Sequence, residues 1–122
     1  IFAAGGIVGG GSDHMQKIGS FRSVNPYNPF LGMATAITRR PKWHEGQLHP
    51  EEALTREQAL RFYTINNAQL LFKETRTGSL EPGKLADLAL LDTDLLTCPE
   101  DKIAQTKAQL TMVGGKVVWE TK

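Results

Sequence analysis

The hydrophobic pattern of this chain changes its period at Gly78, which limits the chain to folds that combine helices with strands. Before Gly78, apolar residues such as Leu31, Ala34 and Ile37 recur at the spacing of one helix face. After Gly78, the runs LADLALLD and LTMVGGKVVWE are apolar and rich in strand-forming residues. We therefore predict an α+β fold, with helices at about 31–40 and 55–72 and β-structure at about 85–92 and 108–120.

Capping and turn residues support these bounds. Pro41 ends the first helix, and the TREQ run that begins at Thr55 fits a capping box, in which a hydroxyl and an amide satisfy free N–H groups. The helix is expected to break or restart in the run TINN, where Asn67 is able to cap a second short helix. Gly114-Gly115 lies between two strand-like runs and predicts a hairpin, because primed turns require positive φ.

Residues 1–12, IFAAGGIVGGGS, are apolar and crowded with glycine. We predict a short buried strand at Ile7-Val8, with a sharp exit and a close backbone approach through Gly9–Gly11. A helix is disfavoured here, because each glycine inside a helix costs about 1 kcal/mol relative to alanine.

Composition excludes several classes of function. The 122 residues contain 14 Lys and Arg against 13 Asp and Glu, a net charge of +1, which argues against a nucleic-acid footprint and against a polybasic membrane surface. Hydrophobic residues make up 40% and suit one globular core, while the apolar runs are too short to span a bilayer. The single cysteine, Cys98, excludes an intrachain disulfide and is expected to be packed. No signal peptide is legible, but in a chain that begins with Ile1 this says nothing about the compartment of the parent protein. The expectation for the parent is a cytoplasmic location.

Two motifs that suggest chemistry are better explained by structure. Gly78–Lys84 satisfies G-x4-G-K, but Leu85 stands where a hydroxyl should bind Mg²⁺ and a strand is expected where a phosphate loop needs a helix. We predict a Pro-Gly turn, with nucleotide binding as the alternative. His44 and His49 lie five positions apart, not the four that a zinc-protease helix requires, so they are expected to be solvated loop residues.

The run Gly11-Ser12-Asp13-His14 is the remaining candidate site. A carboxylate delivered at the exposed end of a buried strand is well placed to meet a metal or a substrate. On local chemistry alone, an Asp that follows Ser in a loop is more often a turn-former or a helix cap than a catalytic residue. One carboxylate and one imidazole also cannot hold a catalytic zinc, which takes three or more protein ligands.

Five segments taken together resemble the C-terminal end of the amidohydrolase superfamily, the metal-dependent hydrolases with a (β/α)8 TIM-like barrel. They resemble above all the large subgroup related to N-substituted formamide deformylase. The segments are GSDH at 11–14, NPFLGMATAITR at 28–39, LTREQALRFYTINNAQLLF at 54–72, GSLEPGKLADLALLD at 78–92 and TMVGGKVVW at 111–119.

The resemblance implies that this chain is an α+β fragment of such a hydrolase. Residues 1–75 would be the last barrel strand, its loop and the C-terminal helices, and residues 76–122 the return into a small β-sandwich with its final hairpin. A barrel needs about 200 residues at least. The 122 residues therefore cannot contain one, and the first residue being Ile1 rather than Met agrees with a piece of a longer protein.

The resemblance also assigns the site. Asp13 would be the strand-eight carboxylate that binds the metal, takes the proton of the attacking water and passes it to the leaving nitrogen, and His14 would face the substrate. Lys84 and Asp87 are interpreted as structural. The reaction implied is hydrolysis of a carbon–nitrogen bond, other than a peptide bond, in a small amide-like molecule.

The other metal ligands of the family, the His-x-His pair, the bridging lysine and two later histidines, are absent from this chain. We therefore expect a divalent metal, Zn²⁺ before others, in the complete enzyme, and neither tight metal binding nor activity in this chain alone. The N-terminal strand, without barrel neighbours, is expected to be unpaired, disordered or paired between chains in a homo-oligomer. The alternative is a non-catalytic, stand-alone structural or interaction domain.

Overall fold

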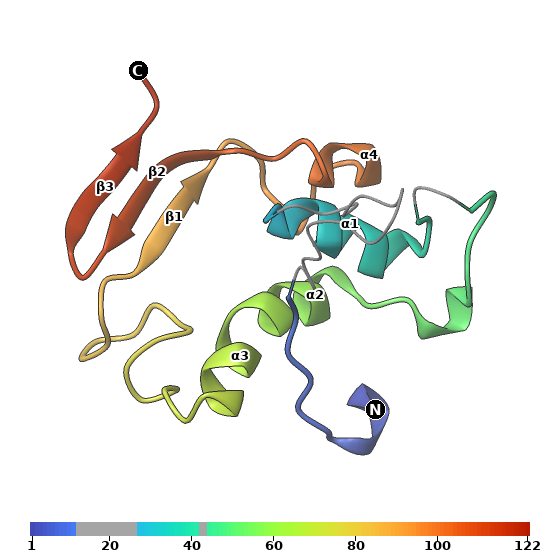
Figure 1. Cartoon of the computed structure of the whole chain (residues 1–122), viewed down its shortest axis with the longest axis horizontal. Helices are drawn as coiled ribbons and strands as arrows, with labels where there is room; N and C mark the ends of the chain where they lie inside the picture. Colours follow the sequence, from blue (N-terminus) through green and yellow to red (C-terminus); the bar gives the residue numbers. More distant parts are fainter. Residues whose placement is uncertain (12–26, 42–43) are drawn as a thin grey trace, which may run out of the picture.

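The computed structural model describes residues 1–11, 27–41 and 44–122. In these residues three helices precede a small sheet, and a fourth short helix lies between its first two strands, which confirms the predicted α+β composition (Figure 1). The helices are α1 (Pro29–Thr38), α2 (Arg56–Tyr63), α3 (Ile65–Leu70) and α4 (Glu100–Ile103), and the strands are β1 (Leu88–Leu91), β2 (Ala108–Val113) and β3 (Lys116–Glu120). Two 3-10 helices, Phe2–Ala4 and Pro50–Glu52, complete the described elements.

Helix α1 begins and ends two residues earlier than predicted. The Asn28 side chain caps it by accepting hydrogen bonds from the N–H groups of Phe30 (3.0 Å) and Leu31 (3.2 Å). Pro29 then occupies the first helical position, where its missing N–H is not needed, so this proline starts the helix instead of belonging to the preceding loop. The helix ends before Arg39, which adopts a left-handed conformation with φ 55°.

The predicted helix at 55–72 is two helices, and the capping box at its start is confirmed. The Thr55 side chain accepts from the Gln58 N–H at 3.1 Å, and the Gln58 side chain accepts from the Thr55 N–H at 2.9 Å. Thr64, with φ −123° and ψ −100°, separates α2 from α3. The break therefore falls where the sequence predicted it, but Asn67 does not cap α3, since its side chain bonds elsewhere.

The three strands form an antiparallel sheet in the order β1-β2-β3. Gly114 and Gly115, both with positive φ, turn β2 into β3, so the predicted hairpin is confirmed. Strand β1 is shorter than the predicted 85–92, because the Leu85 N–H bonds to the Arg76 carbonyl (2.9 Å) outside the sheet. The side chains of β3 are exposed along its whole length.

The Gly78–Lys84 segment forms a turn, as predicted, and leads to strand β1 rather than to a helix. Gly78 has φ 90°, and a Cβ there would lie 2.7 Å from the Ala68 Cβ, so only glycine fits. The Lys84 ammonium donates to the hydroxyl of Ser79 and to the Glu81 carboxylate at 3.2 Å. The Ser79 hydroxyl in turn donates to the Glu81 carboxylate. This bond first, and then the bond and charge of Lys84, hold the pKa of Glu81 below its usual value.

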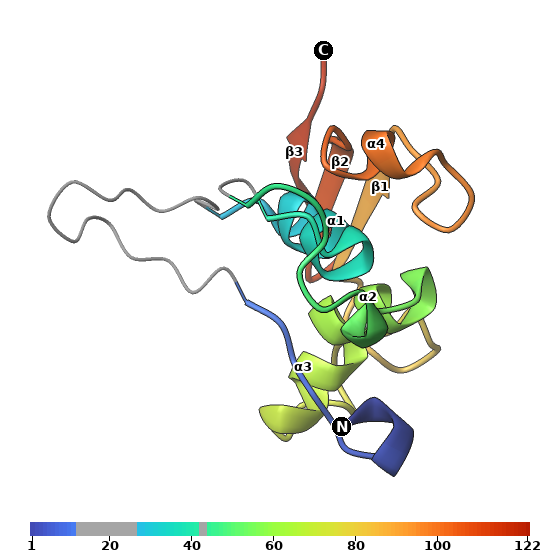
Figure 2. The ribbon, with the colours of Figure 1, turned by 90° about the vertical axis from the view of Figure 1, so that its right-hand side faces the viewer.

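The hydrophobic core lies among the helices. In Figure 2, α1 lies between α4 and α2, and its buried residues Met33 and Ala34 pack with Ala59 of α2 and Ile103 of α4. Cys98 packs against this cluster half-buried, as expected. Among the described residues, no helix has the length and apolar character needed to cross a membrane.

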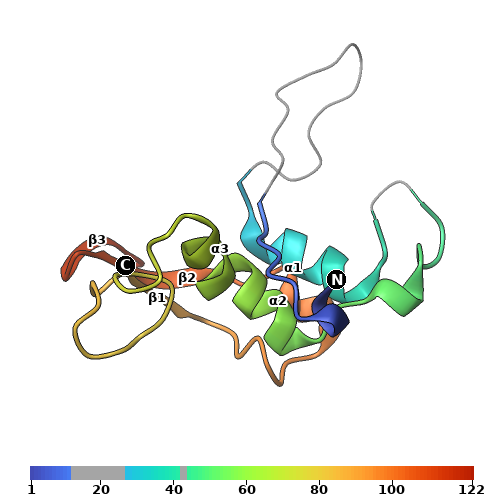
Figure 3. The ribbon, with the colours of Figure 1, turned by 90° about the horizontal axis from the view of Figure 1, so that it is seen from below.

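The strand predicted at Ile7-Val8 does not form. Phe2–Ala4 forms a 3-10 helix, and Ile7 and Val8 belong to no strand, Ile7 being 52% exposed. The segment runs beside α2 instead (Figure 3). A strand requires a neighbouring strand for its backbone groups. Here the helices supply hydrogen-bond partners to Val8 and Gly10, so the segment is not unpaired at these two residues. Pairing between chains stays a prediction.

Candidate functional site

The two candidate site residues, Asp13 and His14, lie outside the described residues, so their roles stay predictions. The structure does describe the segment that leads directly to them, residues 6–11. The contacts that hold this segment are therefore the described part of the candidate site.

Both backbone hydrogen-bonding groups of Gly10 are bonded to residues at the junction of α2 and α3. Its N–H donates to the Phe62 carbonyl at 2.8 Å, and its own carbonyl accepts from the Asn67 side-chain amide at 2.8 Å. Phe62 lies in the last turn of α2, where the carbonyl groups are not needed by a continuing helix. Because α2 ends before Thr64, the Phe62 carbonyl is free to accept the hydrogen bond from the Gly10 N–H.

Asn66 supplies a third bond two residues earlier in the segment. Its side-chain amide donates to the Val8 carbonyl at 2.9 Å, and the residue is only 6% exposed. A buried polar side chain needs a partner, so Asn66 links the core to the segment. The Tyr63 hydroxyl makes a longer contact of 3.5 Å with the Gly11 carbonyl, and burial raises the pKa of this phenol.

Because Gly9 and Gly10 have no side chains, their backbone can lie close to Phe62 and Asn67. A Cβ at Gly10 would overlap the ring of Phe62, and a Cβ at Gly9 would overlap the Asn67 side-chain oxygen. No described residue lies within 4 Å of the position that a Cβ at Gly11 would take. The predicted close approach of the glycine run is therefore confirmed for two of its three residues.

The anchoring role of Asn66 and Asn67 was not predicted, because the run TINN resembles a helix break or a cap. Two adjacent asparagines inside a helical pattern were the available signal, since asparagine is unfavourable in a helix interior unless its amide finds another partner. The partners, Val8 and Gly10, are distant in sequence, so no local pattern identifies them.

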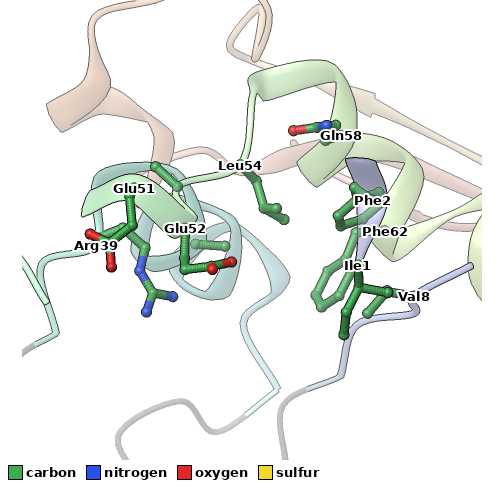
Figure 4. Close-up of a pocket in the computed structure, with 11 residues that line it drawn as sticks. Ile1, Phe2, Val8, Arg39, Glu51, Glu52, Leu54, Gln58 and Phe62 are labelled. Carbon is green, nitrogen blue, oxygen red and sulfur yellow. The ribbon is translucent and has the colours of Figure 1, made fainter. Parts of the chain in front are cut away.

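A cavity of about 500 Å³ lies beside the segment (Figure 4). One side is apolar and includes Phe2, Val8 and Phe62, while Arg39 and Glu51 lie on the other side. A backbone N–H and the imidazole of His49, at 3.1 Å, lower the pKa of the Glu51 carboxyl.

The described residues do not form a metal centre. Within ranges 1–11, 27–41 and 44–122, no group of three or more His, Cys, Asp or Glu side chains could hold a metal ion. His44 and His49 are exposed, which agrees with their interpretation as solvated loop residues. These residues therefore do not fit a catalytic zinc, which takes at least three protein ligands.

The chain is similar in sequence to a known protein family and to curated proteins. The model of the amidohydrolase family matches residues 1–119. N-substituted formamide deformylase of Arthrobacter pascens is 36% identical over 104 residues, which cover 85% of this chain and 19% of that protein. Protein LONG AFTER FAR-RED 3 of Arabidopsis thaliana is 35% identical over 106 residues, which cover 86% of this chain and 18% of that protein.

A solved structure agrees at the level of the fold. The crystal structure of an amidohydrolase from Thermotoga maritima MSB8 matches with a TM-score of 0.59 and 22% sequence identity, over 81% of this chain and 21% of that chain. This chain spans about a fifth of the length of the curated relatives that it matches.

Proposed function

The chain belongs to the amidohydrolase family, and from this premise we propose that it is the C-terminal part of a metal-dependent hydrolase acting on a carbon–nitrogen bond. The observation that carries the proposal is the family match over residues 1–119. The 36% identity to a formamide deformylase supports a small amide-like substrate whose scissile bond is not a peptide bond.

We assign residues 1–75 to the end of a TIM-like barrel and residues 76–122 to a β-sandwich return. Two facts support this division. The described helices α1, α2 and α3 precede Gly78, while all described strands follow it. The chain also covers about a fifth of its relatives, and its 122 residues are fewer than the roughly 200 that a barrel needs.

Asp13 is the residue we assign to the chemistry. Its carboxylate acts as general base, accepting the proton of the attacking water and returning it to the leaving nitrogen. It also serves as one metal ligand, the remaining ligands coming from the rest of the protein. A bound divalent ion, Zn²⁺ before others, would polarise the scissile carbonyl. His14, the next residue, contacts the substrate.

The test is the Asp13→Asn variant of the complete hydrolase. We expect kcat to fall at least about 10³-fold, because a metal ligand and a proton acceptor are lost together. Asp101→Asn, at an exposed position of α4, is the matched control and should retain kcat. Turnover of Asp13→Asn near that of the control would overturn the assignment.

The alternative is a stand-alone structural or interaction domain without catalysis. It is favoured by the lack of a ligand cluster among the described residues. Zinc analysis and an amidase screen of the purified 122-residue chain should find no stoichiometric zinc and no hydrolysis. Stoichiometric, tightly held zinc would contradict the assignment of this chain as part of a larger hydrolase, whereas a complete protein devoid of amidase activity would favour the alternative.

A further inference from the structure

We propose that β1 is the open edge of the sheet, to which one extended strand from the preceding part of the hydrolase adds. This inference rests on the proposed function, because it takes this chain as the C-terminal part of a longer protein. It concerns the sheet and does not depend on the position of Asp13.

The first argument is the direction of the backbone groups of β1, which is one of the two edges of the sheet (Figure 1). The N–H of Asp92 bonds at 3.0 Å to the residue that precedes β2, and the carbonyl of Ala86 accepts at 3.1 Å from the turn that follows β2. Both residues therefore face β2. Because the hydrogen-bonding direction alternates along an antiparallel strand, Ala89 and Leu91 face the outer edge.

These outward groups have no partner among the described residues. The irregularity between β1 and β2 lies in β2, where Gln109 is the extra residue, so the alternation along β1 is unbroken. Outside the ladder with β2, no described residue bonds to the backbone of Ala89 or Leu91. Two N–H groups and two carbonyls therefore line the outer edge of β1, in the spacing that an added strand requires.

The second argument is the difference between the two edges. At β3, the charged residues Lys116 and Glu120 flank the strand, and Val118 is an extra residue where the register with β2 shifts. Charged side chains and bulges are devices by which proteins prevent an edge from pairing. Strand β1 has the sequence LALL, without a charge, a proline or an extra residue. The sheet is therefore protected at β3 and open at β1.

The third argument is the apolar groove of about 660 Å³ that lies between the start of β1, the helices α2 and α3, and the turn Gly78–Leu80. Leu71 and Leu80 line it and are 64% and 73% exposed. Asp87 is the only charged residue among the described ones that line the groove, and its carboxylate already accepts from the Gly114 N–H at 2.7 Å. The side chains of a strand added to β1 would cover this apolar surface.

The fourth argument identifies the occupant as a strand of the same polypeptide. The matched segment is 19% of the formamide deformylase and 21% of the solved amidohydrolase chain, so these relatives have most of their length to supply it. An edge left open between molecules leads to aggregation, whereas a strand in the same polypeptide is present at a high effective concentration. The preceding part of the hydrolase therefore fits the edge better than a second copy does.

The experiment measures amide hydrogen exchange in the complete hydrolase at Ala89, Leu91 and Val117, each corrected for its intrinsic rate. Val117 is the matched position on β3, because alternation from the hairpin turn directs its N–H to the outer edge of that strand. We expect Ala89 and Leu91 to exchange at least about 100-fold more slowly than Val117. Rates within about tenfold of one another would overturn the proposal.

Ala89→Pro tests the same edge by substitution. Proline removes the outward N–H and no bond to β2, and an edge strand tolerates it in this direction. We expect Leu91 to exchange at least about tenfold faster in this variant than in the wild type. Val117→Pro, the matched control at the other edge, should leave Leu91 unchanged. Wild-type exchange at Leu91 in Ala89→Pro would overturn the proposal, and if this variant does not fold, the wild-type comparison decides.

The outcomes also separate this inference from its alternatives. Protection of Ala89 and Leu91 that disappears on dilution, together with dissociation of a dimer, would assign the edge to a second copy and contradict the proposal. If Asp13→Asn loses kcat while Ala89 and Leu91 exchange as fast as Val117, this inference alone is wrong. If Asp13→Asn keeps wild-type kcat, the proposed chemistry fails, and the exchange rates at β1 still decide this inference.

Discussion

Replacing Gly10 by alanine tests how closely the N-terminal segment approaches α2. A Cβ at Gly10 would overlap the Phe62 ring, so either the ring turns away or the segment detaches. Forcing a methyl group into a packed site costs about 1–3 kcal/mol. Detachment would break both hydrogen bonds of Gly10, each with a net contribution of about 0.5–1.5 kcal/mol. Both routes predict that the segment loses about 1–3 kcal/mol of docking free energy.

Hydrogen exchange at the Gly10 amide is the assay, with urea unfolding followed by circular dichroism to report the rest of the fold. Gly11→Ala is the matched control, because no residue that the structure describes lies within 4 Å of a Cβ there and its φ is not positive. That variant should match the wild type or gain up to about 1 kcal/mol through a less flexible unfolded chain. If Gly10→Ala keeps wild-type protection at residue 10, the close approach to Phe62 is refuted.

Three further predictions concern the stability of this chain. Ile103→Ala, at a position 1% exposed, should lower the free energy of unfolding by about 2–5 kcal/mol, and an unchanged urea midpoint would contradict the core described above. Thr55→Ala should cost about 1 kcal/mol by removing the α2 cap, seen as a lower Tm; a Tm equal to the wild type would mean that the capping box contributes nothing. Two hydrogen bonds, from the Lys107 N–H first and then from the Thr93 hydroxyl, hold the pKa of Asp92 below its usual 3.8. The ionised carboxylate therefore stabilises the fold above about pH 4, and this contribution is lost as the pH falls through the folded pKa. Asp92→Asn should therefore flatten the dependence of unfolding free energy on pH below about 4, and equal slopes in both proteins would exclude this role.

Local signals in the sequence predicted the elements whose cause is local. The TREQ capping box, the break after α2 and the Gly114-Gly115 hairpin all occur where the pattern placed them. Helix α4 was missed, because a four-residue helix has no measurable periodicity and depends on the burial of Ile103. The start of α1 was misplaced because the prediction began at the first residue of the apolar spacing, Leu31, whereas Asn28 and Pro29 form the helix start.

The candidate site was predictable only in part. Asp13 was singled out by the order of five motifs rather than by its own surroundings, and it lies outside the described residues. The anchor at Gly10 could not be predicted, because Asn67 lies 57 positions from its partner and its local pattern suggested a cap. The glycine run Gly9–Gly11 did predict a close backbone approach, but it did not identify Phe62 and Asn67 as the residues that lie against it.

The binding of zinc by the complete hydrolase tests the role of Asp13 most directly. A competition titration with a zinc chelator would give the apparent Kd of the wild type and of Asp13→Asn, with Asp101→Asn as control. The account predicts a Kd at least about tenfold higher for Asp13→Asn and unchanged for the control. Equal affinity in all three proteins would show that Asp13 is not a metal ligand and would contradict the account.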